Sequence, residues 1–105
     1  MSGPGGFHAI ADPERCAVVL TGDFDMDGVD AFDDALRAVL AVEPSTVRID
    51  LSGVTYLGSA GLSCLVRADQ SHPQVVLCGP TPIHLRLFEI TGMCSTFTLQ
   101  ADASS

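Results

Sequence analysis

The residues best suited to carry chemistry lie in segment 50–62, DLSGVTYLGSAGL, which holds one serine at the start of an expected helix. Ser59 follows a strand-like alternation and a glycine, and apolar residues at helical spacing come after it. A hydroxyl at a helix N-terminus is a common cap, and a phosphate added there has a large local effect. Ser59 is therefore a candidate N-cap and a candidate modification site.

A second candidate site is the acidic segment 23–34, DFDMDGVDAFDD. Three carboxylates match positions 1, 3 and 5 of a calcium-binding EF-hand loop: Asp23, Asp25 and Asp27. Gly28 matches position 6, but position 12 is Asp34 where the motif has glutamate. The residues before the segment also resemble a strand, where an EF-hand has a helix. The pattern favours a strand-to-helix loop, and a divalent-cation site stays open as an alternative.

Enzymatic motifs are not found in this sequence. Ser59 lies in G-S-A-G, which differs from the G-x-S-x-G of a nucleophile elbow. His8, His72 and His84 are far apart and share no motif with it. The chain has no lysine for a phosphate-binding P-loop and no dinucleotide-binding fingerprint. We therefore expect neither an enzyme nor a cofactor.

Composition and charge restrict the class of partner. The 105 residues suit one globular domain, with hydrophobic residues at 47% and charged residues at 17%. Thirteen acidic residues and five dispersed arginines give a net charge of −8. This charge disfavours binding to nucleic acid or to anionic membranes and favours binding to a basic protein surface.

The location expected from the sequence is the cytoplasm. No stretch reaches the roughly 18 apolar residues of a transmembrane helix, and residues 1–15 have neither the basic start nor the apolar run of a signal peptide. The cysteines show no C-x-x-C spacing and lie in apolar stretches, which predicts reduced, buried thiols. These are Cys16, Cys64, Cys78 and Cys94.

Strand and helix patterns alternate along the chain. Strands are expected at 7–10, 16–20, 47–51, 75–78 and 97–99, and helices at 29–42, from about 60 onwards, and at 82–91. In the last helix, Thr81 is the expected N-cap, Pro82 fits the first helical position and Gly92 fits the C-terminal end. We expect the apolar residues of this helix to face inward. These are Ile83, Leu87, Phe88 and Ile90. The fold class is α/β, a single domain over 7–100 with flexible ends at 1–6 and 101–105. Its mixed sheet of four to five strands is flanked by amphipathic helices.

Three segments, in order, carry a resemblance to a known family. Residues 50–62 resemble the signature of STAS-domain proteins of the anti-anti-sigma factor (anti-sigma factor antagonist) type, with its D-S-[STA]-G loop. Residues 21–25, TGDFD, are similar to the family's T-G-E-L-D segment, and residues 87–93, LFEITGM, to its L-F-x-x-[ST]-G-L segment. The likeness spans roughly residues 15–99.

The resemblance implies a non-catalytic regulator that works by partner switching. Ser59 matches the serine phosphorylated by an anti-sigma factor kinase, and its phosphorylation would end binding to that anti-sigma factor, with a phosphatase as a further candidate partner. The implied partner-binding residues are Asp23, Asp25, Gly58, Ser59, Ala60, Gly61 and Leu62. No cofactor, nucleic acid or membrane is implied.

The chain departs from the signature at two positions. Gly58 stands where the signature has aspartate, and Ala60 stands at the second hydroxyl position, so Ser59 is the one hydroxyl in the turn. A second interpretation keeps the STAS fold and assigns a scaffold or transport-complex subunit that phosphorylation does not control.

Overall fold

The computed structural model describes residues 6–72, 74–93 and 95–100. The strands are β1 (Phe7–Asp12), β2 (Ala17–Phe24), β3 (Val47–Leu57), β4 (Val75–Cys78) and β5 (Thr98–Gln100). The α-helices are α1 (Val29–Leu40), α2 (Ser59–Ser71) and α3 (Pro82–Thr91), and two short 3-10 helices are η1 (Pro13–Arg15) and η2 (Met26–Gly28). None of these helices is long and apolar enough to cross a membrane.

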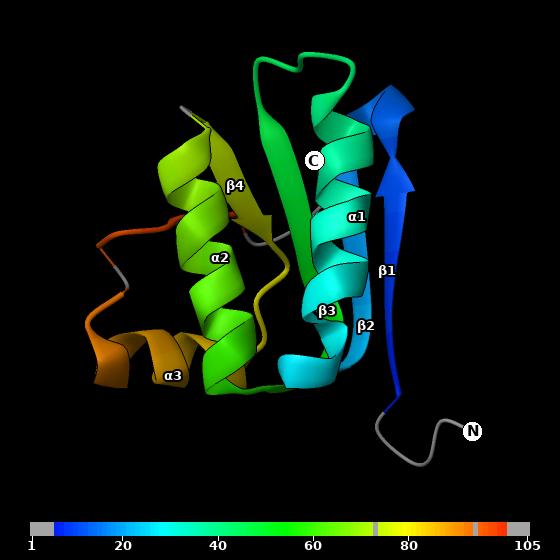
Figure 1. The fold of residues 1–105 in the computed structure, drawn as a ribbon. Helices are drawn as coiled ribbons and strands as arrows, with labels where there is room; N and C mark the ends of the chain where they lie inside the picture. Colours follow the sequence, from blue (N-terminus) through cyan, green and yellow to red (C-terminus); the bar gives the residue numbers. More distant parts are fainter. Residues whose placement is uncertain (1–5, 73, 94, 101–105) are drawn as a thin grey trace.

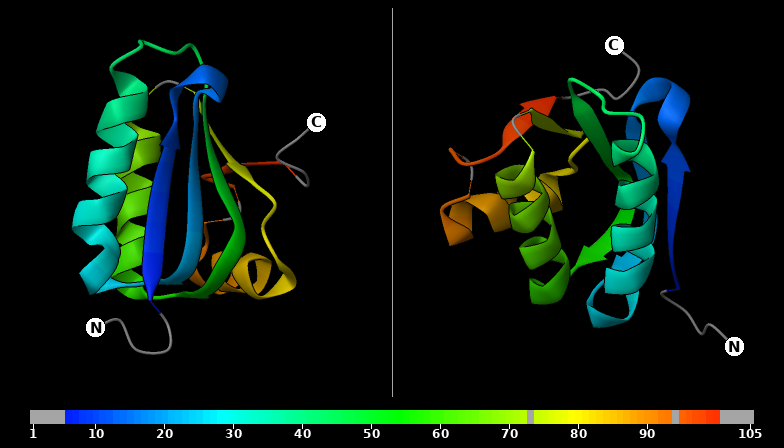
Figure 2. Two further views of the ribbon diagram at one scale, coloured as in Figure 1. Left: turned by 90° about the vertical axis from the view of Figure 1, so that its right-hand side faces the viewer. Right: turned by 45° about the horizontal axis from the view of Figure 1, so that its top comes forward.

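The five strands form one mixed sheet in the order β1-β2-β3-β4-β5. β1 pairs antiparallel with β2, and the remaining pairs are parallel. Parallel neighbours need crossover connections, which α1 and α2 supply on one face of the sheet (Figures 1 and 2). α3 runs across the end of the domain where β3 ends and α2 begins (Figure 1).

The core lies between the sheet and α1 and α2. Alternate residues of β3, namely Val47, Ile49 and Leu51, are fully buried, whereas Ser52 on the opposite face is exposed. Beneath η2, the ring of Phe24 stacks on Phe7 at 4.6 Å between centroids and tilts against Phe32 at 5.2 Å. These contacts bury the end of β2 where the candidate site begins.

The predicted α/β class with a mixed sheet is confirmed, and several boundaries differ. β2 does not end at Thr21 and Gly22 but continues to Phe24, because it keeps pairing with β3 through two register shifts. Cys16 precedes the strand in a left-handed conformation with φ of 54°. The expected flexible ends, apart from Gly6, lie outside the described residues, as does Cys94.

The orientation predicted for α3 is wrong in part. Leu87 and Phe88 face inward as expected, but Ile83 is 72% exposed and Ile90 is 73% exposed. α3 has apolar residues on two faces, so its hydrophobic spacing does not identify the buried one. The buried face is the one that carries Phe88, whose ring meets Phe97 edge-on at 5.2 Å.

Candidate functional site

Ser59 is the first residue of α2, and its side chain is exposed. The N-cap is Gly58, with extended backbone angles of φ −84° and ψ 177°, so the expectation that Ser59 caps the helix is wrong. Among the described residues, the Ser59 hydroxyl has no hydrogen-bond partner. The hydroxyl is therefore available to another molecule.

The turn before Ser59 is anchored to the end of β2. The Gly58 N–H donates to the carbonyl of Phe24 at 2.9 Å, and the Leu62 N–H donates to the carbonyl of Gly58 at 2.9 Å. A Cβ on Gly61 would lie 2.5 Å from the Phe24 carbonyl oxygen and 2.9 Å from its ring carbon Cγ. Glycine at position 61 is thus what lets α2 begin so close to β2.

Asp25 places its carboxylate against Gly58. A Cβ on Gly58 would lie 2.4 Å from Asp25 Oδ1, so the carboxylate occupies the space that a larger residue would need. The first turn of α2 has no acidic residue of its own. Since a helix N-terminus favours nearby negative charge, Asp25 supplies that charge from the β2–η2 junction.

The other two carboxylates of the EF-hand-like pattern, Asp23 and Asp27, do not form a metal site with Asp25. Asp23 Oδ1 accepts a hydrogen bond of 2.7 Å from the Thr55 hydroxyl, which links β2 to β3. Asp27 is exposed in η2. Within the described part of the chain, no group of three or more histidine, cysteine, aspartate or glutamate side chains is placed to hold a metal ion.

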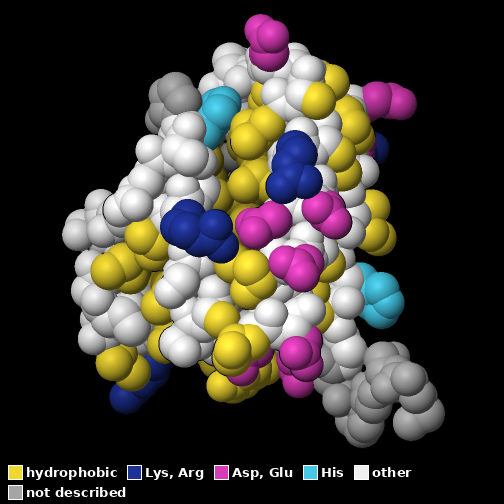
Figure 3. Space-filling model, viewed as in Figure 1, with side chains coloured by type: hydrophobic (Ala, Val, Ile, Leu, Met, Phe, Trp, Pro, Cys, Tyr) yellow, Lys and Arg dark blue, Asp and Glu magenta, His cyan; other side chains and the backbone are white. Residues whose placement is uncertain are grey.

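Exposed apolar side chains are carried by elements at the same end of the domain as the start of α2. Seven large hydrophobic side chains of the described residues are exposed, and five belong to η2, the end of β3 and α3: Met26, Tyr56, Ile83, Leu85 and Ile90. These elements meet at the lower end of the domain in Figure 1, where Figure 3 shows apolar and acidic side chains together. We call these five residues the apolar rim.

The sequence prediction missed the apolar rim. Tyr56 was part of a strand pattern, Met26 lay inside the acidic segment, and Ile83 and Ile90 were assigned to the core. An aromatic residue late in a strand and a methionine among aspartates are weak signals by themselves. Their common location depends on β2 and β3 ending at the same edge of the sheet.

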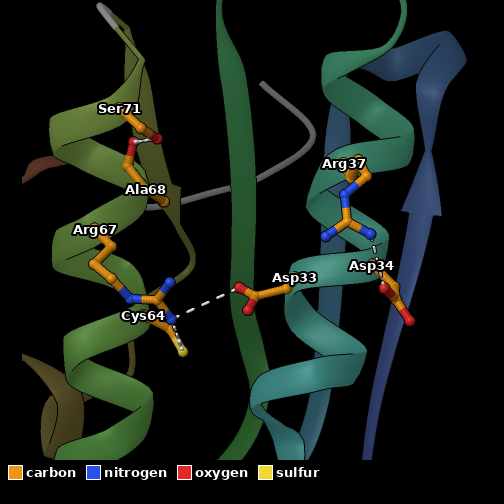
Figure 4. A network of polar contacts seen from close by, with 7 residues as sticks. All are labelled: Asp33, Asp34, Arg37, Cys64, Arg67, Ala68 and Ser71. Carbon is orange, nitrogen blue, oxygen red and sulfur yellow. Dashed lines mark hydrogen bonds and ion pairs between the residues drawn. The ribbon is translucent and has the colours of Figure 1, made fainter.

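A groove of about 410 Å³ lies between α1 and α2, further along α2 from Ser59. In Figure 4, Asp33 points from α1 towards Arg67 of α2, at 3.7 Å, and Arg67 also donates to Cys64 Sγ at 3.2 Å. Burial raises the pKa of the Cys64 thiol, and the Arg67 hydrogen bond opposes that shift. Cys64 and Cys78 are buried as expected, while Cys16 is half-buried.

Comparison with known proteins agrees with the three sequence segments. A family model described as "Mlab, STAS domain" matches residues 7–99. The anti-sigma-F factor antagonist RsfB of Mycobacterium tuberculosis is 33% identical over 99 residues, covering 86% of this chain and 77% of its own. The anti-sigma-B factor antagonist of Listeria monocytogenes is 33% identical over 86 residues, covering 78% and 75%.

A solved structure agrees with the fold. The crystal structure of an anti-sigma factor antagonist from Mycobacterium paratuberculosis superimposes with a TM-score of 0.78 at 28% sequence identity. The match covers 95% of this chain and 90% of that one.

Proposed function

The chain belongs to the STAS domain family as a regulatory binding protein of the anti-sigma factor antagonist type, not an enzyme, and we propose that phosphorylation of Ser59 controls its partner. In this proposal the partner is an anti-sigma factor with serine kinase activity. The unphosphorylated protein binds the anti-sigma factor and so frees a sigma factor for transcription. Phosphorylation of Ser59 ends that binding, and a phosphatase restores it. All these partners act in the cytoplasm.

One observation carries the proposal: an exposed serine with an unengaged hydroxyl directly follows the glycine that packs against Asp25, at the end of the domain that carries the apolar rim. An apolar surface surrounded by polar residues is typical of a protein-binding site. The net charge of −8 suits a partner with a basic docking face. The serine is thus positioned where one added group alters both the shape and the charge of the contact.

The effect of a phosphate follows from its charge. A phosphoserine carries about 1.5 to 2 negative charges at pH 7. Its repulsion with Asp25 is present in the free protein too, so the loss of affinity comes from removing the phosphate from water in the contact, which costs several kcal/mol per ion, or about tenfold or more in affinity.

The proposed switch does not require refolding. Ser59 is the first residue of α2, and the unpaired N–H groups of a helix N-terminus favour an anion. The phosphate is then tolerated in the free protein and disfavoured in the complex. This difference between the two states is what a switch requires.

The test begins with the candidate kinase and ATP, followed by intact mass measurement. We expect one added phosphate on the wild type and on Ser63→Ala, which changes another exposed serine of α2, and none on Ser59→Ala. Equal labelling of Ser59→Ala would contradict the assigned site.

Binding is then measured by calorimetry with Ser59→Asp and its uncharged match Ser59→Asn. We expect Ser59→Asp to lose about tenfold or more in affinity while Ser59→Asn stays close to the wild type. Equal affinity for both variants would favour the scaffold or transport-complex interpretation. An anti-sigma factor that binds none of the three proteins would exclude the proposed partner.

A further inference from the structure

His84 in α3 is the one buried polar side chain of the described residues, at 1% exposure. It lies on the same helix as three members of the apolar rim, Ile83, Leu85 and Ile90. It occupies the third position of a capping box: the Thr81 side chain accepts from the His84 N–H, and the Thr81 N–H donates to His84 Nδ1 at 3.0 Å. The imidazole therefore helps to start α3.

The ring also faces the sheet. The backbone of Val54 in β3 interacts with the imidazole and favours its protonated form, against the effect of burial. Since Nδ1 accepts a hydrogen bond, the neutral ring carries its proton on Nε2. Val54 and Tyr56 lie on β3, which ends at Leu57, directly before Gly58 and Ser59.

Three effects oppose protonation of this ring. A proton on Nδ1 would convert the acceptor of the Thr81 N–H into a donor and break the capping box. The new positive charge would lie at a helix N-terminus, which disfavours cations. It would also be almost fully buried, and burial lowers the pKa of His84, with the Val54 backbone opposing the shift.

No carboxylate of the described residues forms an ion pair with His84. The titratable groups on the elements around His84 are Arg86 and Glu89 of α3, Arg48, Asp50 and Tyr56 of β3, and Cys78 of β4. Arg86 and Glu89 are exposed. A proton on His84 therefore has no acidic partner that would keep the helix in place.

We propose that protonation of His84 breaks the capping box and so releases the first turn of α3, and that acidification thereby displaces the α3 part of the apolar rim. The consequence for the anti-sigma factor rests on the function proposed above, whereas the release itself is a property of the chain alone. Ile83 immediately precedes His84, so its position depends directly on this contact. The device would link partner binding to pH.

The pH range follows from the direction of the shift. The pKa of His84 in the folded protein lies below the ordinary histidine value of 6.5. The stabilising contact is therefore fully present above about pH 6.5 and is lost as pH falls from there towards the lowered pKa. Each pKa unit of lowering corresponds to about a tenfold increase in the ratio of released to docked α3 across that range.

Hydrogen exchange of the α3 backbone amides tests the release without any partner. The variant is His84→Gln, because glutamine at this position also completes a capping box and does not titrate. We expect the exchange rate of wild type relative to His84→Gln to rise between pH 7.5 and 5.0, by about tenfold for each pKa unit. The matched control His8→Gln, at an exposed histidine, should behave as the wild type.

Two results would overturn the inference. The first is the same pH dependence of α3 exchange in wild type and His84→Gln. The second is an NMR titration in which the His84 ring protonates at or above the pH at which His8 does. The titration uses the wild type, so it decides the question even if His84→Gln fails to fold.

Partner binding at pH 7.5 and 5.0 separates this inference from the proposed function. We expect wild type to lose affinity at pH 5.0 relative to His84→Gln, with equal affinities at pH 7.5. Absence of binding at pH 7.5 by both proteins would count against the proposed partner and leave the exchange result standing. If partner binding is equal at both pH values although hydrogen exchange in α3 changes with pH, the proposed effect of α3 on partner binding is refuted.

Discussion

Gly61→Ala tests whether α2 starts in contact with β2. The added Cβ would lie 2.5 Å from the Phe24 carbonyl oxygen, a backbone atom that cannot rotate away. Overpacking of this kind costs about 1 to 3 kcal/mol, while alanine returns about 1 kcal/mol of helix propensity relative to glycine. Since a rigid neighbour favours the upper part of the first range, we expect a net loss of about 1 to 2 kcal/mol in the free energy of unfolding.

Gly58→Ala, three residues earlier, is the matched control. Its Cβ would lie 2.4 Å from Asp25 Oδ1, the end of a flexible side chain that can swing towards solvent. Its backbone angles are open to any residue, so the cost reduces to about 0.5 kcal/mol for alanine in place of glycine at an N-cap.

Urea unfolding followed by far-UV circular dichroism distinguishes the two variants. With an m value of about 1 to 2 kcal/mol/M, Gly61→Ala should lower the midpoint by about 1 M and Gly58→Ala by a smaller amount. A Gly61→Ala protein as stable as the wild type would refute the close approach of α2 to Phe24. A Gly58→Ala protein that is the less stable of the two would show that the Asp25 carboxylate is held rigidly in place.

Two further predictions concern the groove between α1 and α2. Arg67→Ala should lower the free energy of unfolding by less than about 1 kcal/mol, because the ion pair between Arg67 and Asp33 is solvent-exposed. A loss of more than about 2 kcal/mol in the free energy of unfolding, measured by thermal unfolding, would contradict this prediction. In native protein, a thiol-alkylating reagent should label Cys16 before Cys64 and Cys78, since burial shields both and raises the pKa of the Cys64 thiol. Mass-spectrometric mapping would contradict the described packing if Cys64 reacted as fast as Cys16.

The sequence predicts well those features that local rules control. The period-2 alternation in 47–51 corresponds to the first half of β3, and residues 75–78 form β4 as expected. The start and end of α3 agree with the capping pattern, since Thr81 is its N-cap and Gly92 exits in the left-handed region with φ of 76°. Each of these depends on side chains acting within a few residues of one another.

Features that depend on distant contacts could not be predicted in this way. Thr21 and Gly22 look like the end of a strand, and it is the pairing with β3 that continues β2 to Phe24. That extension brings Asp25 to Gly58, 33 positions later in the chain. The acidic spacing of segment 23–34 favours a strand-to-helix loop but leaves a cation site open, and the structure places Asp23 and Asp25 on different neighbours.

The contact between Asp25 and Gly58 gives a physical reason for the departure from the resembled signature. An aspartate at position 58 would direct its Cβ into the space that the Asp25 carboxylate fills, and the two charges would repel. Glycine leaves that space to Asp25, which then supplies a negative charge next to Ser59 at the N-terminus of α2. The acidic character of the turn thus comes from the β2–η2 junction instead of from the turn itself. Because that charge belongs to a separate element, Asp25→Asn can remove it without altering the chain around the serine.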